Sequence, residues 1–518
     1  MIKSGNEISF KESIVVGQES LDITAKKITL IAPITIKDGG LLALENTDLL
    51  SISENALLTL EGAFYQRSTG PVNLSTNIIT TGDDINIKGP LTLTKDVTFD
   101  TGIDAEGDII LSGSVTSDHL IAMNSGTGDI QFDQELSARG LEIQSANTVT
   151  VNGETTMDDA GINASAKTIE INNHVTTMNS GSMQLNIDDG DGGLNFSPGT
   201  TITVDGAFKQ TGNANVNLGA SIQTHDQSIS FDGNITLSAN SLLTTGDNSG
   251  DILFEGEIDG TKDAINRLSL NASTGNIMMN GNLGRNELFD LTIMSGQNVS
   301  IEAPSRLHTY VQESGTGLTH IKDTLYLGAN GFSFKGKDLS FEKDISCNTN
   351  IPGIGMQITH SRQLIIKPNT TISLTGEFTQ AGDGSFALGG NIQTVSAPIT
   401  INGPITLIDN ASIQSMESGN IDIQQTVDSS ATGSYQLNLS AGSGELTFGA
   451  PIGSHSALKG LSVEDAAVIH LDVPVITAQN GIQLKSEQIE SSDTGLQTRH
   501  YYDHRRYLIS GRLADKWW

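Results

Sequence analysis

The chain has 518 residues, a net charge of −32, and only 17% charged and 5% aromatic residues. This excess of carboxylates argues against binding to nucleic acid or to an anionic membrane surface, because both partners are polyanions that attract Lys and Arg. The single cysteine, Cys347, excludes an intrachain disulfide and a cysteine metal cluster, and no apolar run is long enough for membrane insertion.

The first ten residues, MIKSGNEISF, lack the apolar core of a secretory signal. They resemble one coil of a repeat more than a cap. An uncovered coil end leaves backbone groups unpaired, so we expect a piece of a longer protein whose coil ends are capable of self-association. Export by another route and an intracellular location remain alternatives.

A five-residue motif, Gly-x-Phe-x-Gln, occurs three times, and each copy opens a block of 38 residues that aligns with the others without a gap. The copies start 144 and then 170 residues apart. Internal similarity on this scale predicts a repeat protein. We therefore expect repeat units at 1–144, 145–300 and 301–490. The motif residues are Gly62, Phe64, Gln66, Gly206, Phe208, Gln210, Gly376, Phe378 and Gln380.

Within a unit, apolar and polar residues alternate over short runs that are broken by Gly, Asn and Asp. The segment ITINGPITLIDNASI, for example, breaks at Asn402 and Gly403 and then resumes. Such runs are typical of short β-strands joined by tight turns. Separate β-sandwich domains would need linkers, and none interrupts the pattern between Ile8 and about Ile489. The sequence predicts an all-β parallel β-helix with coils of roughly 20 to 25 residues.

The repeated motif has two interpretations, a ligand contact and a packing device. We favour packing, in which the glycine permits a turn, the phenylalanine fills a corner of the coil, and the glutamine bonds the backbone of a neighbouring coil. This interpretation places Phe64, Phe208 and Phe378 inward, at equivalent corners.

Few residues suggest chemistry. Asp188, Asp189 and Asp191 lie in a Gly-rich turn and could bind Ca²⁺, although a solvated turn is the simpler interpretation. His500 and His504 are a weaker metal candidate. Some β-helix proteins degrade polysaccharides with carboxylate pairs, but Lys, Arg and aromatic residues are scarce here, so we expect no enzyme.

Residues 491–518 form an atypical tail. Its end, RHYYDHRRYLISGRLADKWW, contains both tryptophans and three of the seven tyrosines. A terminal cap, a partner-binding segment and non-native translation are the three alternatives.

The motif, the Thr- and Ile-rich runs and the steps GDI and GTGDIQF resemble the repeats of very large bacterial exoproteins, the filamentous haemagglutinin class of secreted adhesins and related autotransporter-like shafts. The resemblance spans about residues 1–490. It implies a right-handed β-helical shaft, export across the outer membrane, and adhesion to a glycan or protein receptor on a cell or matrix. The chain departs from the family in lacking a recognisable amino-terminal secretion domain.

We therefore expect the structural shaft of a secreted or surface-exposed bacterial adhesin. The alternative is a β-helical protein that binds or degrades carbohydrate. A third interpretation is an intracellular piece without a function of its own.

Overall fold

The computed structural model describes residues 1–187, 191–262, 264–348, 355–471, 478–491 and 508–513, without the side chains of 329, 491 and 508–513. The described chain is all-β, and its parallel strands stack as a β-solenoid of about 22 turns, which confirms the predicted fold class. Among the described residues, no helix is long and apolar enough to cross a membrane. The chain divides into two compact units, 1–256 and 257–518.

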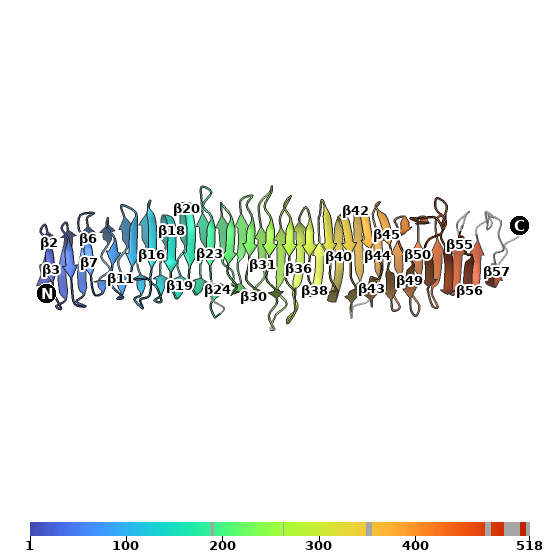
Figure 1. The fold of residues 1–518 in the computed structure, drawn as a ribbon, viewed down its shortest axis with the longest axis horizontal. Helices are drawn as coiled ribbons and strands as arrows, with labels where there is room; N and C mark the ends of the chain where they lie inside the picture. Colours follow the sequence, from blue (N-terminus) through green and yellow to red (C-terminus); the bar gives the residue numbers. More distant parts are fainter. Residues whose placement is uncertain (188–190, 263, 349–354, 472–477, 492–507, 514–518) are drawn as a thin grey trace. The chain divides into compact units, whose positions relative to one another are not determined.

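Unit 1 consists of three parallel sheets, and each turn adds one short strand to each sheet (Figure 1). Sheet I contains β1 (Ile2–Lys3), β8 (Phe64–Gln66), β11 (Ile85–Ile87), β14 (Ile109–Leu111), β17 (Ile130–Phe132), β19 (Thr148–Val151), β21 (Thr168–Ile171), β24 (Gly193–Phe196), β27 (Asn215–Leu218) and β30 (Ile235–Leu237). Sheet II contains β2 (Glu7–Phe10), β9 (Val72–Leu74), β12 (Leu91–Leu93), β15 (Val115–Ser117), β22 (Val175–Thr177), β25 (Thr201–Val204), β28 (Ser221–Thr224) and β31 (Ser241–Thr244). Sheet III contains β3 (Ile14–Val16), β5 (Ile34–Ile36), β7 (Leu58–Leu60), β10 (Ile78–Ile79), β13 (Val97–Asp100), β16 (Leu120–Asn124), β23 (Met183–Asn186), β26 (Phe208–Thr211), β29 (Ile229–Phe231) and β32 (Ile252–Phe254).

Four longer strands of unit 1 bend from one sheet into the next. β4 (Leu21–Leu30) and β6 (Leu42–Ile52) join sheets I and II, and their ladder has an irregularity between Ala25 and Lys27. β18 (Leu136–Ser145) and β20 (Thr155–Ser165) join sheets II and III in the same way.

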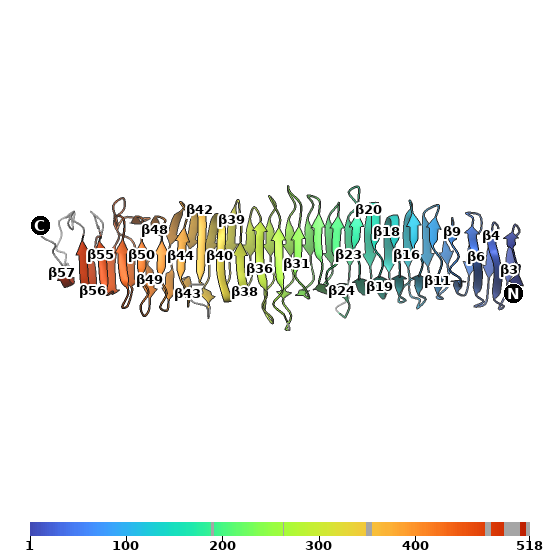
Figure 2. The same cartoon turned by 180° about the vertical axis from the view of Figure 1, so that it is seen from behind.

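Unit 2 has the same construction, again with three parallel sheets (Figure 2). Sheet IV contains β33 (Ile258–Asp259), β41 (Ile345–Cys347), β43 (Thr371–Leu374), β46 (Asn391–Thr394), β49 (Ala411–Ser415), β52 (Gln436–Ser440) and β54 (Gly460–Asp465). Sheet V contains β34 (Arg267–Asn271), β36 (Asp290–Ser295), β44 (Phe378–Ala381), β47 (Ile399–Ile401), β50 (Ile421–Ile423), β53 (Glu445–Phe448) and β55 (Val468–Leu471). Sheet VI contains β35 (Ile277–Met279), β37 (Val299–Ile301), β39 (Leu318–Ile321), β45 (Ser385–Leu388), β48 (Ile405–Leu407) and β51 (Val427–Ser429).

Five strands of unit 2 serve more than one sheet. β38 (Ser305–Gln312) joins sheets IV and V, β40 (Leu325–Phe341) runs through all three, and β42 (Met356–Ile366) joins sheets V and VI. β56 (Ile482–Ser491) and β57 (Leu508–Leu513) pair in parallel across sheets IV and V, so part of the atypical tail adds a strand to the stack.

Alternate residues of each strand point inward and stack on their ladder partners in the next turn. In sheet I, Ile85 pairs with Ile109 and Ile109 with Ile130, and all three are fully buried. In sheet III, Phe231 lies between Phe208 and Phe254, with ring centroids 5.2 and 5.8 Å away. The core of each unit is therefore a set of apolar ladders. The parallel backbone pairing holds neighbouring turns at about 4.8 Å.

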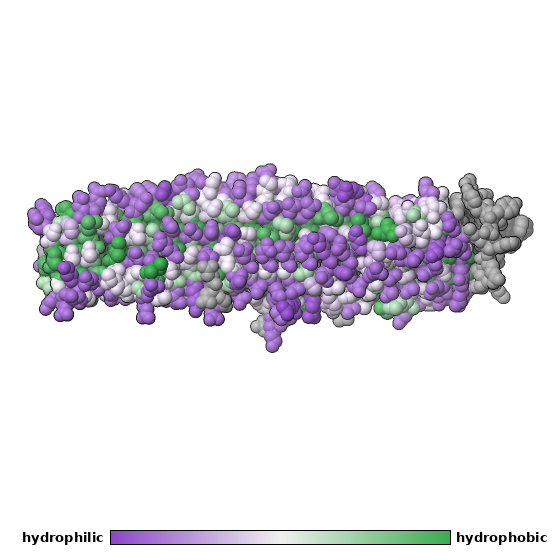
Figure 3. Space-filling model, in the orientation of Figure 1, coloured by the Kyte–Doolittle hydropathy of each residue, from purple (hydrophilic) through white to green (hydrophobic). Residues whose placement is uncertain are grey.

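Outward positions are mostly polar. On the face shown in Figure 3, hydrophilic side chains cover most of the surface, with smaller apolar areas between them. The exposed large apolar residues include Val15, Leu57 and Ile103, which come from separate turns.

Candidate functional site

The motif glutamines are fully buried, and each bonds the backbone of the next turn. Gln66 Oε1 accepts hydrogen bonds from the backbone N–H groups of Lys88 and Gly89, both at 2.9 Å. Gln210 Oε1 accepts from Asp232 (3.1 Å) and Gly233 (2.9 Å).

Gln380 repeats this arrangement in unit 2, where its Oε1 accepts from Asn402 (3.1 Å) and Gly403 (2.8 Å). At all three sites the amide oxygen fills a turn whose two N–H groups face inward. An unpaired buried N–H costs free energy, so the glutamine compensates the turn.

The glycines of these turns are required by close backbone contact. A Cβ on Gly89 would lie 2.0 Å from the Gly70 carbonyl oxygen, and one on Gly233 would lie 2.1 Å from that of Ala214. The motif glycines show the same crowding, since a Cβ on Gly62 would lie 2.3 Å from Gly40 O and one on Gly206 would lie 2.4 Å from Ser182 Oγ. The motif is thus a packing feature that joins one turn to the next through hydrogen bonds and close backbone contacts.

The motif phenylalanines are buried, but they do not share one corner. Phe64 and Phe208 have exposed fractions of 0% and 1%, and Phe378 has 0%. Within unit 1, however, Phe64 belongs to sheet I and Phe208 to sheet III. The expectation of equivalent corners is therefore wrong for these two residues. The 144-residue offset does not correspond to a whole number of turns, so the second copy begins on a different sheet.

The amide nitrogens of the motif glutamines have different partners. Gln66 Nε2 donates to Asn46 Oδ1 at 2.7 Å, and Gln210 Nε2 donates to the backbone oxygen of Thr211 at 2.9 Å. Gln380 Nε2 lies 2.7 Å from His360 Nε2. Because the amide can only donate there, His360 Nε2 accepts and its proton is on Nδ1.

His360 is the buried titratable group of this network. Its side chain is 1% exposed, and Nδ1 has no hydrogen-bond partner among the described residues. Burial lowers the pKa of His360, and the nearby carboxylate of Asp338 opposes this effect. Asp338 itself is paired with Arg362, whose Nε donates to Asp338 Oδ1 at 2.6 Å.

The calcium candidates cannot be assembled from the described chain. Asp188 and Asp189 lie outside the described residues, as do His500 and His504, whereas Asp191 lies just before β24. Within the described ranges, no three His, Cys, Asp or Glu side chains are grouped so that they could hold a metal ion. Cys347 is fully buried, and burial raises the pKa of its thiol to about 11.

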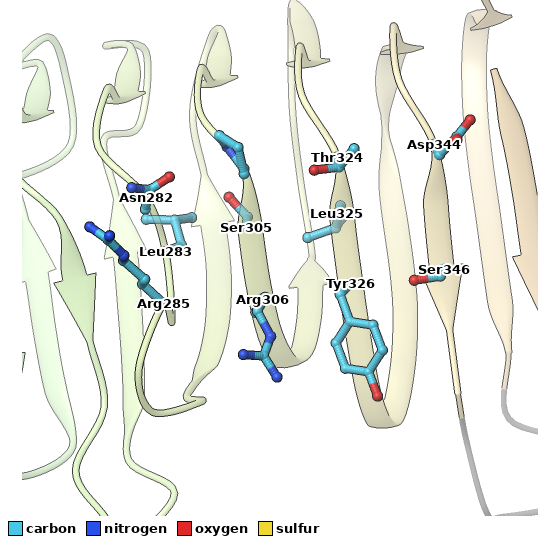
Figure 4. A pocket seen from close by; sticks show the side chains of 11 residues that line it. Asn282, Leu283, Arg285, Ser305, Arg306, Thr324, Leu325, Tyr326, Asp344 and Ser346 are labelled. Carbon is cyan, nitrogen blue, oxygen red and sulfur yellow. The ribbon is translucent and has the colours of Figure 1, made fainter. Parts of the chain in front are cut away.

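A groove on sheet IV of unit 2 gathers cationic, aromatic and hydroxyl side chains (Figure 4). Its volume is about 550 Å³. Leu283, Pro304 and Leu325 form its apolar part, and β38, β40 and β41 supply the successive strands. We call this feature the Arg306 groove.

Arg306 and Tyr326 are ladder partners on neighbouring strands, and Ser346 follows on the next. The guanidinium carbon of Arg306 lies 5.7 Å from the centroid of the Tyr326 ring, which is a cation–π contact. Figure 4 shows both side chains extending from the same side of their strands. Arg306 is exposed, and Tyr326 is half-buried.

The residues at the two ends of the groove are bonded to, or supply, carboxylates that already have partners. At one end, Glu257 Oε1 accepts from Arg285 and from Asn282, each at 2.9 Å, and these two hydrogen bonds lower the pKa of Glu257, that from Asn282 more strongly. At the other end, Asp344 Oδ1 accepts from the backbone N–H of Thr371 at 2.7 Å. Arg306, by contrast, makes no ion pair with any residue that the structure describes.

Sequence reasoning did not single out Arg306 or Tyr326. Arg306 and Tyr326 are one coil length apart in the sequence. They can be assigned to the same outward column only when the coil length at that point is known. Arg and Tyr are both scarce in this chain, and this scarcity was the sequence signal that could have pointed to the pair. A Tyr that follows an unpaired Arg by one coil is rare here.

Comparison with known proteins found no matching family model, no similar curated protein and no similar solved structure.

Proposed function

We propose that this chain is the β-solenoid shaft of a secreted or surface-exposed bacterial adhesin and presents binding surfaces to a cell or matrix receptor. The observation that carries the proposal is the parallel pairing of successive turns within each unit. Backbone hydrogen bonds link each turn to its neighbours, and buried glutamines add cross-links between turns. Each turn is therefore held by many bonds to the turns beside it, as expected for a solenoid whose repeats contact only their neighbours.

The surface chemistry supports the same proposal. A charge of −32 keeps such a chain soluble at high local concentration, and outward Thr, Ser and Asn leave the sheets well hydrated. Turn loops and outward columns can then vary without disturbing the inward ladders. A ligand contact needs only a few outward residues on neighbouring turns.

The experiment uses the organism that carries the gene. Intact cells are treated with a protease, and the chain is followed with an antibody raised against residues 1–256. We expect the chain to be digested on intact cells, and a deletion strain to attach less well to a receptor-bearing surface. Protection of the chain until the cells are lysed would contradict the proposal, and so would unchanged attachment of the deletion strain.

A second candidate is a β-helical protein that binds or degrades carbohydrate, and the Arg306 groove favours its binding form. Incubation of the purified chain with a panel of acidic polysaccharides separates the alternatives. Release of new reducing ends would indicate a degrading enzyme instead of a shaft.

A further inference from the structure

We propose that the Arg306 groove binds a sugar that carries a single carboxylate, with Arg306 as the contact for the anion. This inference deepens the proposed function, because it assigns a ligand class to one presented surface.

The chain has 60 acidic and 28 basic residues, so carboxylate partners are plentiful. In unit 2, Arg267, Arg285 and Arg362 each lie within 4.0 Å of a carboxylate. Arg306 differs from these three, because no described carboxylate pairs with it. A guanidinium presents its N–H donors in a planar fork that fits a carboxylate through two parallel hydrogen bonds.

Tyr326 supplies the second part of the site. Its ring lies on the next turn, beside Arg306, so the anion contact and an aromatic surface are about 4.8 Å apart along the stack. The cation–π contact orders the arginine before a ligand arrives, which reduces the entropy lost on binding. The apolar C–H face of a sugar ring can cover the edge of the Tyr326 ring and the exposed Pro304.

Hydroxyl groups complete the recognition of a polyol. Thr324 and Ser346 line the same groove on the strands of Tyr326 and its successor. Each hydroxyl can both donate and accept, as a sugar requires. The groove volume of about 550 Å³ lies within the range of pockets that hold small ligands.

The carboxylates near the ends of the groove limit how many negative charges a ligand can carry. Asp344 lines one end of the groove, and Glu257 bonds Asn282 and Arg285, which line the other end. Arg306 lies between these ends and has no ion pair with a described residue. A ligand with one carboxylate can place it on Arg306, whereas a densely charged polymer would bring further anions against these carboxylates. The groove therefore selects against polysulfated chains and phosphate-rich ligands.

The test compares methyl glucuronide with methyl glucoside, which differ only in the carboxylate, by ligand-observed saturation-transfer NMR on the full chain. The methyl glycoside of N-acetylneuraminic acid is a second probe, and it distinguishes a nine-carbon acidic sugar from a hexuronate. We expect saturation of at least one carboxylated probe and none of methyl glucoside. Arg306→Gln and Tyr326→Ala should each weaken binding about tenfold or more.

Lys335→Gln is the matched control, because it removes one exposed positive charge from unit 2 outside the groove. It should bind like the native chain. Arg306→Lys keeps the charge without the fork and should bind more weakly than native. All variants are compared by circular dichroism melting, so that loss of fold is recognised.

Three results would overturn the inference: no binding of either carboxylated probe by the native chain, equal binding by Arg306→Gln, or stronger binding of dextran sulfate than of the acidic sugars. None of these results affects the outcome of the protease experiment on intact cells. If Arg306→Gln abolishes sugar binding but cells still attach normally, the ligand assignment stands and the groove is not the adhesive contact.

Discussion

The motif glutamines bury a polar side chain, and they are tolerated because the amide oxygen meets two backbone N–H groups. Gln66, Gln210 and Gln380 share this feature, although their amide nitrogens have different partners. The oxygen is therefore the common requirement and the nitrogen is satisfied locally.

Gln66→Ala tests this requirement. We expect the variant to lose about 1 to 3 kcal/mol of stability around that turn, because the Gly89 N–H loses its acceptor and the Lys88 N–H keeps only the backbone oxygen of residue 66, at 3.3 Å. Hydrogen exchange of the Lys88 and Gly89 amides should accelerate accordingly. Gln223→Ala is the control, because Gln223 is exposed on the same unit. Equal effects of the two substitutions would contradict the packing role.

We expect His360 to make unit 2 sensitive to acid. Burial lowers its pKa in the folded chain, so its contribution to stability is present above the ordinary histidine pKa of about 6.5 and is lost as the pH falls through the folded value. Protonation also places a donor on Nε2, where Gln380 already donates. The pair of Asp338 and Arg362 lies near the ring.

His360→Asn removes the titrating imidazole. Asparagine is chosen because Asn46 occupies the equivalent position beside Gln66. Asn46 lies two residues after the ladder partner of Gln66, as His360 lies two residues after that of Gln380. Between pH 7 and pH 5, the native chain should show faster exchange of the Asn402 and Gly403 amides than the pH change alone causes. The variant should show less of this extra acceleration, and identical profiles would show that His360 is not the acid-sensitive group.

At the scale of the element, each strand is short and depends on the turn beside it. A strand of three residues buries two side chains, so its position is secured by the ladder above and below and by the turn geometry. Turn glycines such as Gly89 therefore allow two turns to approach closely, because a Cβ would not fit between them.

Gly89→Ala tests this closeness. The new methyl group would meet the Gly70 carbonyl at 2.0 Å, so the turn must open and the hydrogen bonds to Gln66 must lengthen. We expect a loss of about 1 to 3 kcal/mol by denaturant unfolding. Gly5→Ala adds the same methyl group where nothing lies within 4 Å and should be nearly neutral. A neutral Gly89→Ala would mean that the turn has room that its geometry does not indicate.

At the scale of the whole molecule, the excess of carboxylates opposes the stacking of turns. Like charges on successive turns repel, and salt screens them over about 10 Å at 0.1 M. The neutral ladders of the interior must overcome this repulsion.

We expect the melting temperature to rise between about 10 mM and 300 mM NaCl, because screening favours the compact state. MgCl₂ and CaCl₂ at equal ionic strength should match each other unless a specific calcium site exists. An additional calcium effect that Asp191→Asn removes would support the turn at Asp188, Asp189 and Asp191 as a metal site. A fall in melting temperature with NaCl would contradict the role of charge repulsion.

The sequence by itself determined the fold class of this protein, because the alternation of inward and outward residues is a local property. Segments such as Ile85–Ile87 and Ile399–Ile401 show it within three residues, and the repeat shows that the same solution recurs. The buried glutamine and its turn glycine could also be anticipated from their recurrence.

Tertiary structure decided which residues of different turns meet. The length of each coil varies, and these differences accumulate along the chain, so Phe64 and Phe208 begin the same motif on different sheets. The length of the single coil between them places Arg306 beside Tyr326, and no described carboxylate pairs with Arg306. A surface site on a solenoid is built from residues one coil apart, and only the stacked turns fix that register.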